Sequence, residues 1–341
     1  MTNRKITITE VAEWANVSIT TVSHYLNGTK KVSAESSRRI QAAINELNYI
    51  PNINARSLKQ KRTRVIGIVI PDMVIYSAIC QYIESFLYEH DYSVIICNTG
   101  FNQAKENIQL HALLEQRVDG ILLASSGQNS RFIQSIQDSG TPIVLFDRYQ
   151  PDLPHFTYVL ENSVVCIEKL TNHVISMGHK NIAYMKGPDN STVSEERFEI
   201  FKSILARNAL REHPEFYYSN CMTKQDCMKA YDHLFAHRGE VTALITTNAN
   251  QIKYFIMAAH EHGIRVPDEM SFTGFGVEDY KTLFEPPVTC IIQNHYEIAK
   301  NCAKCILELM EYRQNETPMA EMSKTILLES EFFIGKSVTR V

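Results

Sequence analysis

From residue 65 onward the chain alternates short, almost wholly apolar runs with amphipathic stretches of helical length. Helical periodicity covers residues 77–90, 103–117 and 129–139. The apolar runs between these stretches are too apolar for strands with one face in water: Val65–Ile70, Tyr92–Cys97, Gly120–Ala124 and Pro142–Asp147. Runs of this kind, separated by helices, predict a parallel sheet that helices cover on both faces.

The same alternation begins again after about residue 162. Apolar runs recur at residues 181–185, 241–246 and 270–275. Two doubly wound lobes in one chain predict a cleft at the carboxyl ends of their strands, where a small-molecule site belongs. We expect an N-lobe of about residues 65–161 and 292–322, and a C-lobe of about residues 162–291 and 323–341.

The first 50 residues have a different pattern. Residues 9–28 hold two short apolar-periodic segments joined by a tight turn at residues 16–18. Val22 and Leu26 are four residues apart and face inward, Ser18 suits the N-cap of the second segment, and Gly28 suits its end. A third helix is expected after a Ser33 cap. The pattern is typical of a DNA-reading helix-turn-helix, and a small three-helix lobe without a ligand is the alternative.

Charge favours the DNA-binding interpretation. Residues 1–64 carry eleven Lys or Arg against four Asp or Glu, whereas the whole chain carries 34 against 38. The remainder therefore has 23 basic and 34 acidic residues. A basic segment on an acidic body is expected when one end of a protein neutralises phosphates and the rest stays away from them.

The chain has no run of about 18 apolar residues and no apolar segment behind its basic start, so we expect a cytoplasmic protein without a membrane partner. Its eight cysteines have irregular spacing, which favours reduced thiols. Cys302 and Cys305 fall on one apolar helical stripe, which predicts a core or interface role for both rather than a redox pair or half of a zinc site.

The usual catalytic motifs are missing from the sequence. The twelve histidines are scattered, and there is no H-E-x-x-H, G-x-S-x-G or Walker pattern. We therefore expect no enzyme activity, no catalytic residue, no metal and no cofactor. Residues 51–64 are expected to form a linker. Residues 52–59 have the length for two helical turns that need support from DNA or a second copy, and a flexible tether is the alternative.

Motifs along almost the whole chain resemble the LacI/GalR family of bacterial transcription regulators. They are Ile8–Ala12, Val17–Ser23, Leu26–Gly28, Asn48–Asn52, Ala55–Leu58, Ile66–Asp72, Val118–Gly120, Phe146–Arg148, Gly178–Ile182, Arg265–Asp268 and Pro286–Thr289. The resemblance implies an α/β fold with an N-terminal helix-turn-helix DNA-binding head (residues 1–50), a hinge helix and linker (residues 51–64), and a periplasmic-binding-protein-like core of two doubly wound parallel-sheet lobes (residues 65–341).

The resemblance also implies which residues contact operator DNA. Ile19, Thr20 and His24 match family positions that face base edges, and Leu58 matches a hinge leucine that enters the minor groove. The full implied set is Ser18, Ile19, Thr20, Thr21, Ser23, His24, Asn27, Asn52, Ala55 and Leu58. Most members have arginine in place of His24, and this difference concerns the bases preferred rather than DNA binding itself.

For the cleft, the resemblance implies effector contacts from Tyr76, Asp147, Arg148, Arg197, Asn248 and Gly276. Ala249 and Gly276 stand where many sugar-binding members have aspartate. Two carboxylates are therefore missing while two arginines remain, which favours an anionic effector such as a sugar acid or sugar phosphate. The alternative is a neutral sugar, for which Asn294 or Glu161 replaces the lost contacts.

These observations predict a dimeric, ligand-responsive transcription regulator that represses carbohydrate-utilisation genes. Its partners would be double-stranded operator DNA, a sugar-like effector and a second copy of the chain. The principal alternative is a small-molecule-binding protein of periplasmic-receptor fold with no role in transcription. The basic head and the missing export signal argue against that alternative.

Overall fold

The computed structural model describes residues 6–27, 30–49, 62–189, 191–276, 281, 283–314 and 322–341. The chain divides between Thr63 and Arg64 into two compact units. From here on, the head is the first unit, Met1–Thr63, and the core is the second, Arg64–Val341. Asn52, Ala55 and Leu58, which were predicted to contact DNA, lie outside the described residues, as does Gly28.

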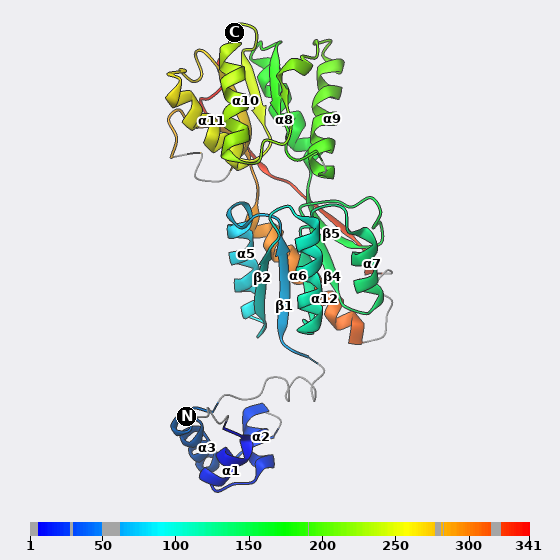
Figure 1. Ribbon diagram of the computed structural model, residues 1–341, viewed down its shortest axis with the longest axis vertical. Helices are drawn as coiled ribbons and strands as arrows, with labels where there is room; N and C mark the ends of the chain where they lie inside the picture. The colour runs from blue at the N-terminus through cyan, green and yellow to red at the C-terminus, as the bar shows by residue number, and fades with distance from the viewer. Residues whose placement is uncertain are drawn as a thin grey trace. The chain divides into compact units, whose positions relative to one another are not determined.

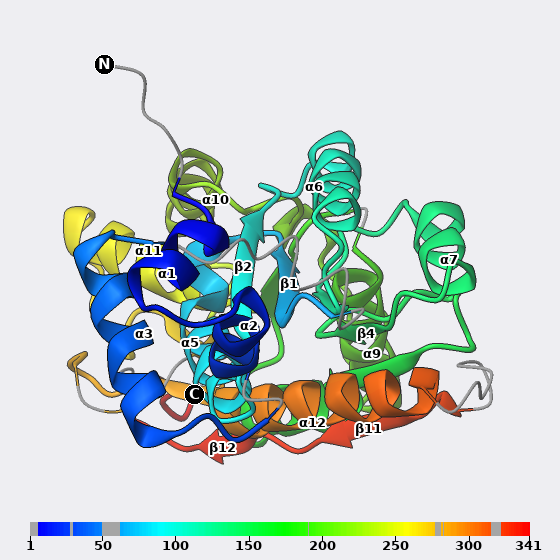
Figure 2. The same cartoon turned by 90° about the horizontal axis from the view of Figure 1, so that it is seen from below.

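The described part of the head is a group of three helices (Figure 2). Helix α1 begins with a capping box, in which Thr7 and Glu10 each bond the other's backbone N–H group. Ser33 caps α3 by accepting from the N–H of Ser36, as the sequence predicted. The helices are α1 (Ile8–Trp14), α2 (Ile19–Asn27) and α3 (Ala34–Glu46). Their shared core contains Val11, Ala12, Ala15, Val22, Ile40 and Ala43.

The N-lobe contains a six-stranded parallel sheet with the order β11-β5-β4-β3-β1-β2. Its strands are β1 (Val65–Ile70), β2 (Ser93–Asn98), β3 (Gly120–Leu123), β4 (Ile143–Phe146), β5 (Thr157–Glu161) and β11 (Thr325–Leu328). Its helices are α5 (Met73–Tyr88), α6 (Gln103–Glu115), α7 (Ser130–Asp138) and α12 (His295–Gln314).

Helices cover both faces of this sheet. Ile66, Ile68 and Ile70 of β1 belong to a buried cluster with residues of α5 and α12. Val69, which points the other way, belongs to a second cluster with residues of α6 and α7. Because both faces of the sheet are buried, the strand sequences are continuous apolar runs and do not alternate between apolar and polar residues.

The C-lobe repeats this plan (Figure 1). Its sheet has the order β12-β10-β9-β8-β6-β7, and only the β10–β12 pair is antiparallel. The strands are β6 (Ile182–Met185), β7 (Tyr217–Tyr218), β8 (Ala243–Thr246), β9 (Ser271–Gly276), β10 (Thr289–Ile292) and β12 (Glu331–Phe333). The helices are α8 (Ser163–Ser176), α9 (Thr192–Arg207), α10 (Lys224–Ala236) and α11 (Ala249–Glu261), with a short 3-10 turn at Pro214–Phe216. The predicted architecture of two doubly wound lobes is confirmed.

One predicted boundary was wrong. We expected residues 323–341 to belong to the C-lobe, but β11 pairs with β5 and is an edge strand of the N-lobe sheet. The chain enters the C-lobe only between Leu328 and Glu331. The alternately exposed residues of this edge strand produce a weak apolar signal, and its partner lies more than 160 residues earlier in the sequence.

All eight cysteines are free and buried. Cys302 and Cys305 lie on the face of α12 that packs against the N-lobe sheet, which confirms their predicted core role. Burial raises the pKa of the Cys302 thiol, which disfavours the reactive thiolate form. Among the helices that the structure describes, none is long and apolar enough to cross a membrane.

Candidate functional site

The front of α2 presents two side chains to solvent. Ser18 caps this helix, since its Oγ accepts from the N–H of Thr21 at 3.1 Å and lies 2.8 Å from the Thr21 hydroxyl. Ile19 and Thr20 are exposed, whereas Val22 is fully buried. The Ile19 side chain is 47% exposed and is therefore accessible for an apolar contact.

The remaining predicted DNA contacts on α2 are partly covered. Thr21, Ser23 and His24 are half-buried, and Asn27 is the last residue of the helix. Sequence reasoning missed Tyr25, whose hydroxyl donates to the Gln41 side chain at 2.8 Å and so ties α2 to α3. This bond fixes the direction of the helix that carries the exposed residues.

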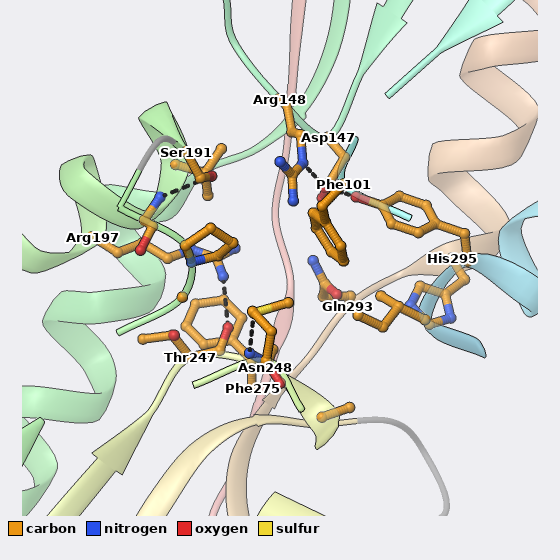
Figure 3. A pocket seen from close by; sticks show the side chains of 18 residues that line it. Phe101, Asp147, Arg148, Ser191, Arg197, Thr247, Asn248, Phe275, Gln293 and His295 are labelled. Carbon is orange, nitrogen blue, oxygen red and sulfur yellow. Dashed lines mark hydrogen bonds and ion pairs between the residues drawn. The ribbon is translucent and has the colours of Figure 1, made fainter. Parts of the chain in front are cut away.

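In the core, a cavity of about 100 Å³ lies where the carboxyl ends of strands from both lobes meet (Figure 3). Five of the six predicted effector contacts line it: Tyr76, Asp147, Arg148, Arg197 and Asn248. The sixth, Gly276, ends β9 opposite Ile292, next to Phe275, which lines the cavity. The other lining residues are Ile75, Phe101, Gly187, Pro188, Ser191, Val193, Ser194, Met222, Thr247, Ala249, Gln293 and His295.

On the N-lobe side, Asp147 is the central acceptor. It follows β4 with a φ of 63°, a conformation that costs free energy for a residue other than glycine and recurs at functional sites. The Tyr76 hydroxyl donates to Asp147 Oδ2, and Arg148 Nε lies 3.9 Å from the same oxygen. Burial, and then the charge of Asp147, raises the pKa of Tyr76, so this phenol remains a neutral donor.

On the C-lobe side, Arg197 uses each of its three nitrogens within the protein. Its Nε donates to Ser163 Oγ at 3.5 Å, its Nη1 to the Thr247 carbonyl at 3.0 Å, and its Nη2 to Glu161 Oε2 at 2.8 Å. The guanidinium group also lies 3.8 Å from the centre of the Phe275 ring. The Arg197 side chain is therefore held in one position on the C-lobe side of the cavity.

Two buried polar atoms in the lining have no hydrogen-bond partner in the structure: Arg148 Nε and Ser194 Oγ. Buried donors and acceptors are almost always satisfied in native proteins, so two such atoms on residues that line one cavity favour a polar ligand or water there. Asn248 uses its Oδ1 to cap α11 through the N–H of Gln251 at 3.0 Å.

Sequence reasoning missed Phe101, Gln293 and His295. Gln293 directly follows β10, so recognition of that strand would have placed it at the cleft. The alternative contacts suggested for a neutral sugar are not in the lining. Asn294 caps α12 through the N–H of Glu297 at 3.0 Å, and Glu161 lies behind Arg197. In the described parts of the chain, no three His, Cys, Asp or Glu side chains form a group that could hold a metal ion.

Comparisons with known proteins match both units. A sequence model of bacterial regulatory proteins of the lacI family matches residues 7–52, and a model of periplasmic binding proteins and the sugar binding domain of the LacI family matches residues 63–333. The HTH-type transcriptional repressor PurR of Aliivibrio fischeri (strain MJ11) is 30% identical over 329 residues, which cover 95% of this chain and 97% of that protein. PurR of Aliivibrio salmonicida (strain LFI1238) is 29% identical over 324 residues, with 94% and 97% covered.

Solved structures agree on the fold. The lac repressor dimer bound to operator and the anti-inducer ONPF has a TM-score of 0.82 and 23% identity, covering 98% of this chain and all of that chain. The complex of the transcriptional regulator CelR with cellobiose has a TM-score of 0.69 and 22% identity, with 98% and 100% covered.

Proposed function

Because this chain belongs to the lacI family of bacterial regulatory proteins, we propose that it is a transcriptional repressor whose affinity for operator DNA changes when a small effector binds in the core. The observation that carries this proposal is the combination of a basic helix-turn-helix head with a polar cavity in a separate unit. Operator DNA is cytoplasmic in bacteria, so the proposal places the chain there. A receptor without a role in transcription would not need the head.

DNA would be read by the front of α2. Ile19 and Thr20 are the exposed pair, and the half-buried Ser23 and His24 lie one turn further along the helix. Ser18, Thr21, Asn27, Asn52, Ala55 and Leu58 complete the proposed contact set. Base contacts set sequence preference, while the excess of Lys and Arg in the head supplies salt-dependent affinity for phosphates.

Selection from random DNA with the full chain tests this proposal. Thr20→Ala should change the enriched sequence at one position, with a loss of about 1–3 kcal/mol in discrimination. Ser37→Ala, which removes a hydroxyl from α3 instead, is the matched control and should return the wild-type sequence. If the wild-type chain enriches no sequence at all, the repressor proposal is wrong.

The effector that we propose is an uncharged sugar. Arg197 is paired with Glu161, and Arg148 lies beside Asp147, so two cations and two anions meet at the cavity. Burial lowers the pKa of His295, which keeps its ring neutral at pH 7. An anion would leave an uncompensated charge in a largely buried site, which costs free energy. The preference for a sugar acid or sugar phosphate rested on unpaired arginines and therefore loses its support.

Size and lining also favour a single sugar ring. A cavity of about 100 Å³ is smaller than the roughly 150 Å³ that holds one benzene ring, so a bound ring requires a small movement of the lobes. Phe101 and Phe275 supply apolar surface, while Asp147, Gln293 and Ser194 supply polar atoms. A mostly apolar wall with a few fixed polar groups is typical of small-molecule sites.

A melting-temperature screen of neutral sugars, sugar acids and sugar phosphates tests the effector class. A true ligand at about 100 times its Kd adds about 2.7 kcal/mol to the stability of the core. Phe101→Ala should abolish the shift, whereas Phe132→Ala, which removes another half-buried N-lobe ring outside the cavity, should preserve it. If only the charged ligands shift the melting temperature, the charge argument is wrong and the repressor proposal stands.

We place the homodimer contact on α5, β2 and the start of α12. β2 is an edge strand of its sheet. Exposed apolar side chains on these elements are Met73, Val74, Tyr82, Tyr88, Ile96 and Tyr296. Exposed apolar side chains on elements next to an open strand edge favour pairing with a second copy. In analytical ultracentrifugation, Ile96→Lys should sediment as a monomer. Ile108→Lys, which changes an exposed isoleucine of α6 outside the proposed contact, should remain a dimer. A dimeric Ile96→Lys chain would contradict this placement.

A further inference from the structure

The chain passes between the two lobes three times within the described residues (Figure 1). The first crossover joins β5 to α8, the second joins β10 to α12, and the third joins β11 to β12. Any change in the angle between the lobes must be absorbed in these short segments, because the packed lobes on either side move as units.

One side chain contacts all three crossovers. Glu161 ends β5 and so begins the first crossover. Its Oε1 accepts from Ser330 Oγ in the third crossover, and its Oε2 accepts from Gln293 Nε2 in the second at 3.4 Å. The first and third crossovers are also joined through the backbone, since the N–H of Asn162 donates to the Leu328 carbonyl at 3.0 Å.

The same carboxylate reaches the effector cavity through two partners. Gln293 lines the cavity, and Arg197, which donates to Glu161 Oε2 at 2.8 Å, forms its C-lobe wall. The side chain of Glu161 is only 4% exposed. A buried carboxylate with three donors is strongly disfavoured when one donor is withdrawn, so the network favours a single arrangement of its members.

We propose that the Glu161 side chain, which we call the joint, fixes the three crossovers relative to one another and so sets the angle between the lobes. A change at Gln293 or Arg197 alters that angle through Glu161. This inference rests on the proposed function, in which an effector in the cavity alters DNA binding. Glu161 does not line the cavity itself, so it is a positioning residue that acts through its two partners.

The chain offers a close control for this joint. Glu168 of α8 forms an ion pair with Arg207 of α9 at 2.9 Å, which is the same chemistry at nearly the same distance. Both partners belong to the C-lobe, and the pair is largely exposed. Glu168→Gln therefore removes a comparable ion pair without touching a crossover, whereas Glu161→Gln removes the charge at the joint and keeps the side-chain volume.

The experiment measures the distance between the lobes in the full chain. Spin labels are placed on Ala104→Cys in α6 and Ala206→Cys in α9, both exposed. The native cysteines are buried, so the introduced ones should label selectively. Dilution with unlabelled chain leaves one labelled subunit per dimer, and pulsed dipolar spectroscopy then gives the distribution of distances.

The wild-type chain should give one narrow distribution. Glu161→Gln should at least double its width or shift its centre, Ser330→Ala should have a smaller effect in the same direction, and Glu168→Gln should match the wild type. A Glu161→Gln distribution equal to that of the wild type would overturn the joint. If Glu161→Gln does not fold, Ser330→Ala decides, because it keeps the Glu161–Arg197 pair and removes only the third crossover, and an unchanged width would then overturn the proposal.

A functional readout separates this inference from the proposed function. With a sugar from the melting screen, the ratio of operator Kd values with and without sugar should fall toward one in Glu161→Gln and remain at the wild-type value in Glu168→Gln. A wild-type chain that binds no operator refutes the repressor proposal, while the distance measurement still tests the joint in the ligand-free protein. An unchanged ratio in Glu161→Gln refutes the joint alone.

Discussion

Replacement of Arg197 by methionine should destabilise the core while the head is unaffected. Methionine fills similar space but leaves the Glu161 carboxylate buried without its cation. Removal of one partner from a buried ion pair costs about 3–5 kcal/mol. Ser330 and Gln293 still donate to this carboxylate, so we expect the lower end of the range, about 3 kcal/mol, which corresponds to a fall in Tm of about 5 °C for a unit of this size.

The effect should depend on pH with a defined sign. Burial raises the pKa of Glu161, and Arg197 is the largest influence that opposes this shift. In Arg197→Met the folded-state pKa of Glu161 should rise further above its unfolded value, so the folded variant binds a proton more readily than the unfolded chain does. Its stability deficit relative to the wild type should therefore shrink as the pH falls from 8 to 5.

Two signals separate the units in one urea titration. Trp14, the only tryptophan, lies in α1 of the head, so its fluorescence reports the head, whereas far-UV circular dichroism is dominated by the core. Arg197→Met should lower the urea midpoint of the circular dichroism transition and leave that of the tryptophan fluorescence transition unchanged. The double variant with Glu161→Gln should be less destabilised than the sum of the two single variants. Additive effects, or an equal shift of the tryptophan transition, would refute the reasoning.

Two further predictions concern the C-lobe. His179 is buried between the Thr242 hydroxyl and the Thr339 carbonyl, and burial lowers its pKa. The neutral ring therefore stabilises the fold above about pH 6.5, and this contribution is lost as the pH falls further. His179→Gln should show a smaller fall in Tm between pH 7 and pH 5 than the wild type, and equal falls would contradict this. Gly274→Ala should prevent folding or strongly lower the Tm in a thermal melt, because the new Cβ would lie 2.5 Å from the backbone oxygen of Thr246. A Tm equal to that of the wild type would contradict the close approach of β9 and β8.

Features that depend on neighbouring residues could be predicted from the amino-acid sequence. The caps at Ser18 and Ser33, the inward face of α2 at Val22, and the buried strands of both lobes follow from local spacing, because a helix or a doubly covered strand imposes its period on the residues that form it. The short β7 and the strands β5, β10, β11 and β12 were not recognised. The edge strands β7, β11 and β12 bury too little surface to produce a clear pattern, whereas β5 and β10 are buried, central strands whose sequences include polar residues.

The electrostatics of the cavity could not be predicted in this way, because it depends on how distant segments fold together. From the sequence, Arg148 and Arg197 appeared as two cations that had lost their acidic partners. The fold brings Glu161, 36 residues before Arg197, and Ser330, 169 residues after Glu161, into one buried network. Which charge neutralises which depends on distances between segments that no spacing rule connects, because Coulomb interactions and desolvation follow proximity in space rather than order along the chain.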